Sequence, residues 1–224
     1  MILLMAAIAG ADADGDLAAR RELMVTTQIA AHGVHDPRVL AAMRKVPRHL
    51  FVPDAVRDRA YEDSPLSIGD GQTISQPYIV AFMTELAQPR PEARVLEVGT
   101  GSGYQTAVLA EVAHEVYSIE IVAALAARGK ETLHGLGYRN VHLRTGDGHR
   151  GWPEAAPFDA IVVTAAPEHV PQPLLDQLAP GGRLVIPVGD RFDQALEVHE
   201  RTATGIERRR VAVVAFVPMT GEER

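Results

Sequence analysis

The feature that most constrains this chain is a glycine-rich turn between a predicted strand and a predicted helix. Mainly apolar residues at 95–98 lead into Gly99, Gly101 and Gly103, and apolar residues at 107–110 follow. This order predicts a buried parallel strand, a tight turn and the first turn of a helix. Glycines let the backbone pass close to a ligand, and a helix N-terminus offers it unpaired N–H groups. The stretch therefore predicts a loop that binds a nucleotide.

The spacing of the glycines narrows the class of nucleotide. A dinucleotide fingerprint reads G-x-G-x-x-G, but Tyr104 occupies the place of its third glycine. The pattern from Glu97 to Gly103 is E-x-G-x-G-x-G, which is similar to the first motif of Rossmann-like methyltransferases that bind S-adenosylmethionine. A glycine-rich strand, turn and helix also occur as ordinary turn chemistry, so the residues downstream decide between the two.

Strands and helices continue to alternate after the loop. Further strands are predicted at Val116–Glu120, Val141–Arg144, Phe158–Thr164, Arg183–Val188, Ala195–His199 and Val211–Val217, the last two joined by a hairpin or an irregular crossover. We therefore expect an α/β fold with a doubly wound, mainly parallel, seven-stranded Rossmann-like methyltransferase sheet and an N-terminal helical cap. In such a sheet, ligands bind at the carboxyl ends of the strands.

The chain divides into an N-terminal extension, residues 1–16, and a single S-adenosylmethionine-dependent methyltransferase domain, residues 17–224. Within this domain, residues 17–77 are the expected N-terminal cap and active-site loop, and residues 78–224 the Rossmann-like core. The apolar run at 1–10 lacks a basic region and is too short to span a bilayer. A mis-assigned start and a weak export signal are the alternatives to a real extension.

Composition argues against several partners and chemistries. The formal net charge of −7 disfavours a broad nucleic-acid surface, which needs clustered Lys and Arg. The chain has no cysteine, which rules out disulfides and thiolate zinc sites and fits a reducing compartment. The nine histidines show no metal-ligand spacing with acidic residues. We expect a cytoplasmic monomer without metal, nucleic-acid or membrane partners.

Polar residues stand where several of the predicted strands end. Glu120 lies 17 residues after Gly103, at the end of the second strand, where a carboxylate can accept hydrogen bonds from both ribose hydroxyls. Asp147 and Gly148 follow the third strand, where a carboxylate and a backbone N–H could bind the adenine edge. Thr164 closes the fourth strand. Single acids at strand ends are often caps, but this order favours a nucleotide site.

A long loop punctuated by glycine and proline is predicted from Tyr61 to Pro77, before a core-facing helix that contains Ile79. Loops of this length are usually functional or mobile. Ser75 lies where the helix would have its N-cap, so its local sequence is equally compatible with a capping role and a role at a site.

Five stretches carry a resemblance to one family: Leu96–Tyr104 (LEVGTGSGY), Gly146–Gly148 (GDG), Pro157–Ile161 (PFDAI), Thr164–Pro167 (TAAP) and Pro180–Leu184 (PGGRL). The most diagnostic stretch is Gly71–Pro77 (GQTISQP), which generic methyltransferases lack. With these motifs, the chain from about Leu23 to Thr220 resembles the protein-L-isoaspartate (D-aspartate) O-methyltransferases.

The resemblance implies an enzyme that transfers a methyl group from S-adenosylmethionine to the free α-carboxylate of L-isoaspartyl and D-aspartyl residues. Its substrates would be damaged proteins and peptides, its products S-adenosylhomocysteine and an ester that returns to aspartate through a succinimide. It implies that Ser75 is the catalytic-site serine, that residues 72–74 help to enclose the cofactor, and that Phe216–Thr220 match the closing strand beside the site. The expected cofactor-binding residues are Gln72, Thr73, Ile74, Glu97, Gly99, Thr100, Gly101, Ser102, Gly103, Glu120, Asp147, Gly148, Thr164 and Thr220.

Three other functions are compatible with part of the sequence. A methyltransferase acting on nucleic-acid amines would carry an N-P-P-aromatic element where this chain has Thr164–Pro167. A small-molecule methyltransferase fits the core motifs but leaves Gly71–Pro77 unexplained. A non-catalytic module would bind the cofactor without transferring its methyl group.

Overall fold

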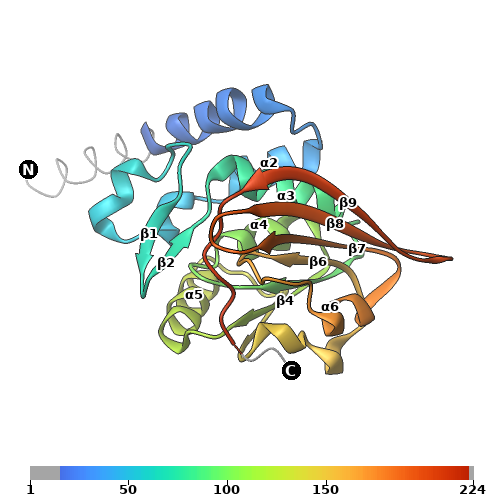
Figure 1. The fold of residues 1–224 in the computed structure, drawn as a ribbon. Helices are drawn as coiled ribbons and strands as arrows, with labels where there is room; N and C mark the ends of the chain where they lie inside the picture. The colour runs from blue at the N-terminus through green and yellow to red at the C-terminus, as the bar shows by residue number, and fades with distance from the viewer. Residues whose placement is uncertain (1–15, 222–224) are drawn as a thin grey trace, which may run out of the picture.

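Seven strands form the central sheet of this computed structural model, which describes residues 16–221 (Figure 1). In spatial order they are β5 (Val141–Thr145), β4 (Glu115–Glu120), β3 (Arg94–Val98), β6 (Phe158–Val163), β7 (Leu178–Gly189), β8 (Gln194–Thr202) and β9 (Gly205–Val214). Neighbouring strands from β5 to β7 are parallel, whereas β8 and β9 are antiparallel to their neighbours. The predicted α/β fold with a mainly parallel seven-stranded sheet is confirmed.

Helices cover both faces of this sheet. On one face, α3 (Pro77–Ala87) and α4 (Tyr104–Val112) pack against Val95 of β3. On the other face, Leu174 of α6 (Gln172–Asp176) packs against Leu96. Adjacent residues of β3 therefore point into different apolar clusters, which is why apolar residues occupy the consecutive positions Val95 and Leu96. A further helix, α5 (Ala123–Gly135), contacts β4 and β5.

The N-terminal cap consists of short helical segments. Residues 16–23 are α-helical and continue as a π-helix (Met24–Ile29) and a 3-10 helix (Ala30–His32). The next helix, α2 (Pro37–Lys45), has Asp36 as N-cap, whose side chain accepts a hydrogen bond from the Arg38 N–H. Two 3-10 helices follow, Arg48–Phe51 and Asp54–Arg59.

The cap packs on α4 through aromatic and charged groups. Phe51 meets Tyr104 of α4 edge to face, with ring centroids 5.6 Å apart. The fully buried Arg48 guanidinium lies 4.9 Å from the centroid of the same Tyr104 ring. The first turn of α4, directly after the glycine-rich loop, is thereby fixed by the cap.

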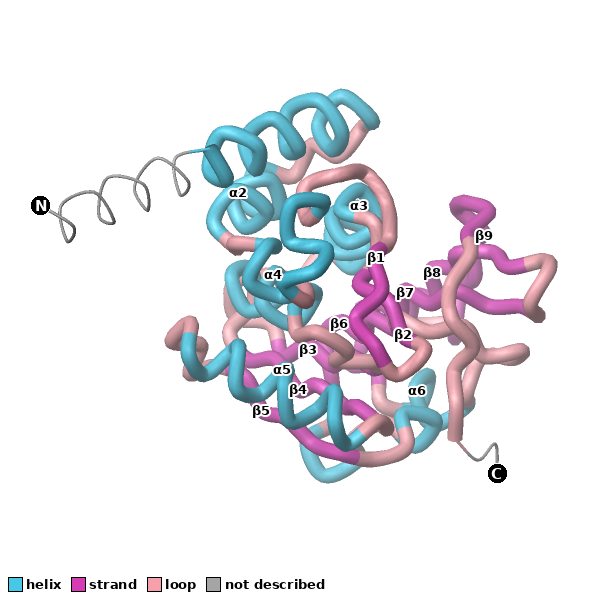
Figure 2. The backbone as a smooth tube through the Cα atoms, turned by 90° about the vertical axis from the view of Figure 1, so that its left-hand side faces the viewer, coloured by secondary structure: helices cyan, strands magenta, loops and turns pink. Residues whose placement is uncertain are grey.

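Part of the predicted long loop is a β-hairpin. Residues Leu66–Gly69 and Gln72–Ile74 form the strands β1 and β2 of a separate two-stranded antiparallel sheet. Figure 2 shows this hairpin in front of the large sheet. The prediction of a loop is therefore wrong over these strands. The alternation of Leu66 and Ile68, both buried in the apolar cluster of the cap, is too short to stand out among glycines and prolines.

The tip of the hairpin is fastened to α5. Asp70 adopts a left-handed conformation (φ 54°) between two glycines that do the same. The Arg128 guanidinium donates hydrogen bonds to the Ile68 carbonyl (3.0 Å) and to the Asp70 carboxylate (2.8 Å). Both members of this ion pair are exposed to solvent, with side-chain exposures of 54% and 41%.

The C-terminal part agrees with its prediction in one respect and differs in another. Of the two predicted connections between the last two strands, the structure has the hairpin, with Thr202 paired to Gly205. However, β9 ends at Val214, and the predicted closing strand Phe216–Thr220 is irregular apart from a single bridge between Ala166 and Pro218. Pro218 has no N–H to donate to a ladder, which accounts for the loss of regular pairing.

The predicted extension, residues 1–16, lies outside the described residues except for Asp16, which is already helical. Of the helices that the structure describes, none combines the length and apolar character needed to cross a membrane.

Candidate functional site

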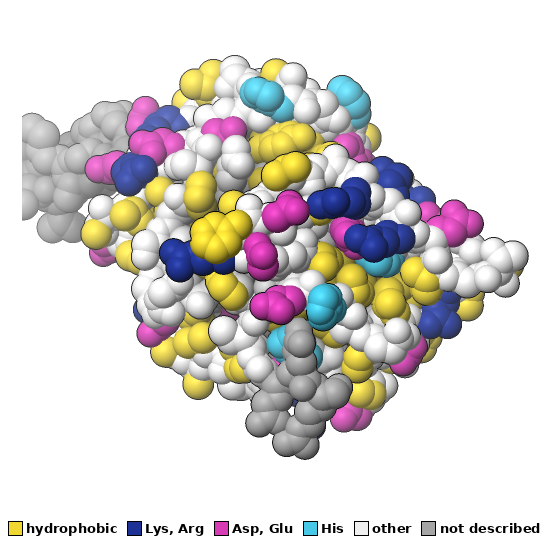
Figure 3. All heavy atoms as spheres, in the orientation of Figure 1, with side chains coloured by type: hydrophobic (Ala, Val, Ile, Leu, Met, Phe, Trp, Pro, Cys, Tyr) yellow, Lys and Arg dark blue, Asp and Glu magenta, His cyan; other side chains and the backbone are white. Residues whose placement is uncertain are grey.

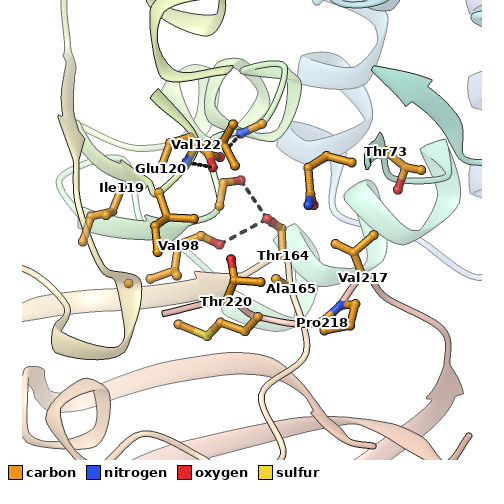
Figure 4. A pocket seen from close by; sticks show the side chains of 16 residues that line it. Thr73, Val98, Ile119, Glu120, Val122, Thr164, Ala165, Val217, Pro218 and Thr220 are labelled. Carbon is orange, nitrogen blue, oxygen red and sulfur yellow. Dashed lines mark hydrogen bonds between the residues drawn. The ribbon is translucent and has the colours of Figure 1, made fainter. Parts of the chain in front are cut away.

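The carboxyl ends of β3, β4 and β6 surround a cleft of about 580 Å³, its open mouth included (Figure 4). The β1–β2 hairpin contributes Gln72 and Thr73 to its wall. The other lining residues come from strand ends and the segments after them: Val98, Gly99, Gly101, Ile119–Val122, Gly148, Thr164, Ala165 and Val217–Thr220. Eight of the predicted cofactor-binding residues therefore line one cleft: Gln72, Thr73, Gly99, Gly101, Glu120, Gly148, Thr164 and Thr220.

The glycine-rich loop forms one wall of the cleft because its backbone lies against β6. Gly99 has φ 97°, and a Cβ placed on it would lie 2.3 Å from the Thr164 Oγ1 atom. The Thr164 hydroxyl donates hydrogen bonds to the carbonyls of Gly99 (2.7 Å) and Val98 (3.1 Å), as Figure 4 shows. A larger residue at Gly99 would displace the Thr164 hydroxyl and would be strained at this positive φ, which explains the glycine.

Glu120 stands at the end of β4 on the wall of the cleft. Its carboxylate accepts hydrogen bonds from the N–H groups of Gly101 (2.7 Å) and Val122 (2.9 Å), one on each oxygen. Each carboxylate oxygen keeps a second lone-pair direction, so the group can still accept from two hydroxyls of a ligand. The carboxylate is thus positioned before any ligand binds.

Gly148 and Asp147 have different surroundings although they are neighbours. Gly148 lines the cleft, and a Cβ there would lie 2.3 Å from a methyl carbon of Val98. The Asp147 carboxylate accepts hydrogen bonds from the backbone N–H of His149 and lies 3.0 Å from its Nδ1. Asp147 lines an adjoining hollow that also contains Arg144 and Arg150, not the cleft itself.

Glu97 lies beneath the glycine-rich loop and does not line the cleft. Its Oε2 accepts hydrogen bonds from the hydroxyls of Thr106 and Ser118, and the Ser118 oxygen lies 2.6 Å from the Thr100 hydroxyl. Its Oε1 is buried without a partner in the described chain. Burial raises the pKa of Glu97 to about 8, so the side chain is mainly the neutral acid at pH 7.

The remaining predicted positions surround the cleft without lining it. Ile74 is buried against the cap, Thr100 is buried in the hydrogen-bonded group beneath the loop, and Gly103 is the N-cap of α4. Ser102 faces a different hollow, beside Phe51 and Arg128. Thr100 and Gly103 thus hold the loop in place, whereas Ile74 and Ser102 face other parts of the protein.

Ser75 lies in a second cavity next to the cleft. This cavity is lined by Pro65, Thr73, Ser75, Gln76, Ile79, Thr164 and Val213–Val217, and it shares Thr73, Thr164 and Val217 with the cleft. The N-cap of α3 is Gln76 and has no side-chain cap bond, so the capping role considered for Ser75 is wrong. Within the described chain, the Ser75 hydroxyl makes no hydrogen bond and is available to a ligand.

Several lining residues escaped prediction from the sequence. Ile121 and Val122 directly follow Glu120, and their place just beyond a strand end was a usable signal. Val217, Pro218 and Met219 also line the cleft; the resemblance placed them beside the site, within Phe216–Thr220, but only Thr220 of this stretch was predicted to bind the cofactor. Among the described residues, no group of three or more His, Asp or Glu side chains is arranged to hold a metal ion.

Known proteins are similar to this chain in sequence and in fold. Residues 19–224 match the family model described as protein-L-isoaspartate(D-aspartate) O-methyltransferase. Proteins named protein-L-isoaspartate O-methyltransferase include one from Picosynechococcus sp., 58% identical over 91% of both chains. Another, from Gloeobacter violaceus, is 59% identical over 89% of this chain and 98% of its own.

Two solved structures have the same fold. One, named protein-L-isoaspartate O-methyltransferase, is 29% identical with a TM-score of 0.82, and the match covers 90% of this chain and 66% of that one. The other, from Plasmodium falciparum, is a candidate protein-L-isoaspartate O-methyltransferase in complex with S-adenosyl-L-homocysteine. It is 25% identical with a TM-score of 0.76, over 89% of this chain and 98% of that one.

The raised pKa of Glu97 predicts a specific pH dependence of stability. Between the usual pKa of 4.5 and the folded pKa of about 8, the folded chain holds a proton that the unfolded chain has released. Stability therefore falls as pH rises through this window, by up to about 1.4 kcal/mol per pH unit. Glu97→Gln keeps the shape of the side chain and stays neutral at every pH, so it removes the pH dependence of stability that comes from Glu97.

We expect thermal unfolding midpoints of the native chain and Glu97→Gln to be similar near pH 5 and to separate towards pH 8, with the variant higher. Subtracting one plot of midpoint against pH from the other cancels the titration of all groups that the two proteins share. Parallel curves from pH 5 to pH 8 would contradict a buried neutral acid at this position.

Proposed function

Since this chain belongs to the protein-L-isoaspartate(D-aspartate) O-methyltransferase family, we propose that the cleft binds S-adenosylmethionine and that the Ser75 cavity binds an isoaspartyl carboxylate. The enzyme transfers a methyl group to L-isoaspartyl residues of proteins and thereby initiates their repair. The observation that carries the assignment of the two sites is their common wall of Thr73, Thr164 and Val217. A methyl donor in one cavity and a carboxylate in the other would meet at this wall.

The cleft has the features that a nucleoside with a sulfonium side chain requires. Glu120 offers a fixed carboxylate for two ribose hydroxyls, and Gly148, whose backbone packs closely against Val98, lines the same cleft where a base can lie. Gly99 and Gly101 bring backbone close to the ligand on the opposite side. S-adenosylmethionine, when bound, supplies an electrophilic methyl group on sulfur. The related structure from Plasmodium falciparum holds the demethylated product, which supports this assignment.

The acceptor needs orientation more than activation. A free carboxylate with a pKa near 4 is ionised at pH 7, so no general base has to remove a proton. Holding two reactants in attack geometry can contribute on the order of 7–11 kcal/mol to lowering a barrier. The Ser75 hydroxyl can donate a hydrogen bond to one carboxylate oxygen and leave the other directed at the methyl group. The apolar side chains of Ile79 and Val214 limit the water around the carboxylate.

The product ester needs no further catalysis by this site. A methyl ester is a better electrophile than a carboxylate, so the backbone amide nitrogen of the following residue attacks the ester carbonyl, gives up its proton and expels methanol. The resulting succinimide opens by spontaneous hydrolysis, which returns some aspartate. D-aspartyl residues are proposed as additional acceptors. The cytoplasmic location and the monomeric state stay predictions from the sequence.

The proposed reaction is tested with two synthetic peptides that differ only in Asp against isoAsp. An isoaspartyl linkage moves the free carboxylate by one methylene, and a site that depends on geometry should respond strongly. We expect a labelled methyl group to be transferred to the isoaspartyl peptide and not to its twin. Equal labelling of both peptides, or of neither, would contradict the assignment, and an RNA pool tests the nucleic-acid alternative.

Glu120→Ala should weaken the binding of S-adenosylhomocysteine by about 1–3 kcal/mol, because hydrogen-bond partners of a charged group lose their acceptor. Isothermal calorimetry measures the change, and thermal unfolding shows whether the loop bonds to Gly101 and Val122 also matter for stability. Glu131→Ala, an exposed substitution on α5, is the matched control. Unchanged affinity in Glu120→Ala would remove this residue from the ligand site.

Ser75→Ala should lower kcat/KM for the isoaspartyl peptide by about tenfold to hundredfold, the effect of one hydrogen bond to a charged group. Cofactor affinity and the unfolding midpoint should stay unchanged, because the hydroxyl has no partner in the folded chain. Ser67→Ala, at an exposed serine of β1, controls for the loss of a hydroxyl on the hairpin. Normal turnover in Ser75→Ala would refute the orienting role.

A further inference from the structure

The strand β9 is the last in the sheet and leaves one backbone edge unpaired. Its final residues and those after it form an uninterrupted apolar run, Val211–Val217, which we call the apolar edge. The Val213 side chain is 85% exposed. Exposed apolar edges pair readily with other chains, and natural proteins usually protect them with charges or prolines. Here the arginines at 208–210 protect only the preceding half of β9.

The apolar edge faces the Ser75 cavity through its backbone. Five consecutive residues, Val213–Val217, line that cavity. Side chains alternate between the two faces of an extended chain, so a consecutive series lines a space only when the backbone edge itself faces it. The edge and Ser75 therefore bound the same space from opposite sides.

Unused backbone groups lie along this edge. The N–H and carbonyl of Phe216 bond to the Gln194 side chain, at 2.6 and 3.2 Å, on the side of β8. Ala215 directly precedes Phe216 and has no backbone hydrogen bond to the described part of the chain. Its N–H and carbonyl are open to a partner in the cavity.

We propose that the polypeptide flanking the isoaspartyl residue binds as an additional strand along the apolar edge. The proposal rests on the proposed function, since it places the isoaspartyl carboxylate at Ser75. An extended segment supplies its own backbone N–H and carbonyl groups to Ala215 and its neighbours and covers the exposed Val213. A segment held in a helix has no such groups free, so unfolded regions are selected.

Arginines continue the edge away from Ser75 and add selectivity. In the described chain, Arg208 is paired with the buried Glu197, whereas the exposed Arg209 and Arg210 have no hydrogen-bond or ion-pair partner. Figure 3 shows basic side chains gathered over β8 and β9 beside hydrophobic ones. A paired strand advances about 3.3 Å per residue, so a flank of roughly four to six residues reaches these arginines. The protein has a net charge of −7, and this local basic group favours an acidic flank.

Peptide length tests the pairing. A short peptide has one residue on each side of isoaspartate, and a long peptide has six neutral residues on each side. We expect kcat/KM to be about tenfold higher for the long peptide, mainly through KM, as one or two net backbone hydrogen bonds would produce. Equal values would overturn the proposal, whereas methylation of neither peptide would overturn the proposed function instead.

Two N-methylated forms of the long peptide provide a matched control. One form carries N-methyl groups on the odd-numbered flanking amides and the other on the even-numbered ones, so that only one form loses the N–H groups facing the edge. We expect one form to fall to the kcat/KM of the short peptide and the other to keep the gain. Equal kcat/KM for the two forms would overturn strand pairing.

Charge selectivity is tested with two glutamates placed five and six residues from isoaspartate, on either flank. A strand pairs in one direction, so we expect only one flank to raise kcat/KM, by about threefold over the glutamine version, the effect of two exposed ion pairs. The double variant Arg209→Gln/Arg210→Gln should lose this gain. The equally charged control Lys130→Gln/Arg139→Gln, at exposed positions on and after α5, should keep it. An equal gain on both flanks, no gain, or its loss in the control would overturn the assignment to these arginines.

Discussion

The close approach of Gly99 to Thr164 is the contact on which the rest of the site depends. Thr164 directly follows β6, Gly99 begins the turn after the adjacent β3, and the threonine hydroxyl donates a hydrogen bond to the glycine carbonyl at 2.7 Å. This contact holds the loop against one strand and leaves the ends of β3 and β4 open to a ligand. Glu97 stabilises the same loop from below, through Ser118 and Thr100. The site is therefore built largely from backbone held in place by buried hydroxyls.

The two cavities separate the tasks of the reaction. The cleft is bounded by fixed strand ends, whereas the Ser75 cavity is bounded by the hairpin, α3 and an unpaired backbone edge. The first arrangement suits a ligand that is the same in every turnover. The second suits acceptors with many different sequences, because an extended chain can be held through backbone groups that all sequences share.

The sequence predicted those parts of the fold and of the site that follow from the pattern of neighbouring residues along the chain. The buried strands β3 and β6 are mainly apolar, and the glycines of the loop mark a turn that a side chain would block, so fold and cleft could be inferred. The hairpin was missed because its strands have only four and three residues. The positions of Glu97 and Asp147 depend on which way a side chain points after folding, and both are held by partners outside the cleft. The sequence could not exclude a capping role for Ser75, because that role depends on where the helix begins. The helix begins one residue later than a cap at Ser75 requires.

The ion pair between the hairpin tip and α5 has a consequence for access to the two cavities. Arg128 and Asp70 form an exposed ion pair, and such pairs contribute only about 0–1 kcal/mol. The glycine-rich loop and the strand ends cannot move without disturbing the core, and the hairpin strands are held by Leu66, Ile68 and Ile74, which are buried in the apolar cluster of the cap. Only the exposed tip of the hairpin around Asp70 can move at little cost. The tip is followed directly by Gln72 and Thr73, and Thr73 lines both cavities. A movement at the tip therefore changes the approach to both cavities together, whereas Thr164 and Val217, on the other side of their common wall, stay in place.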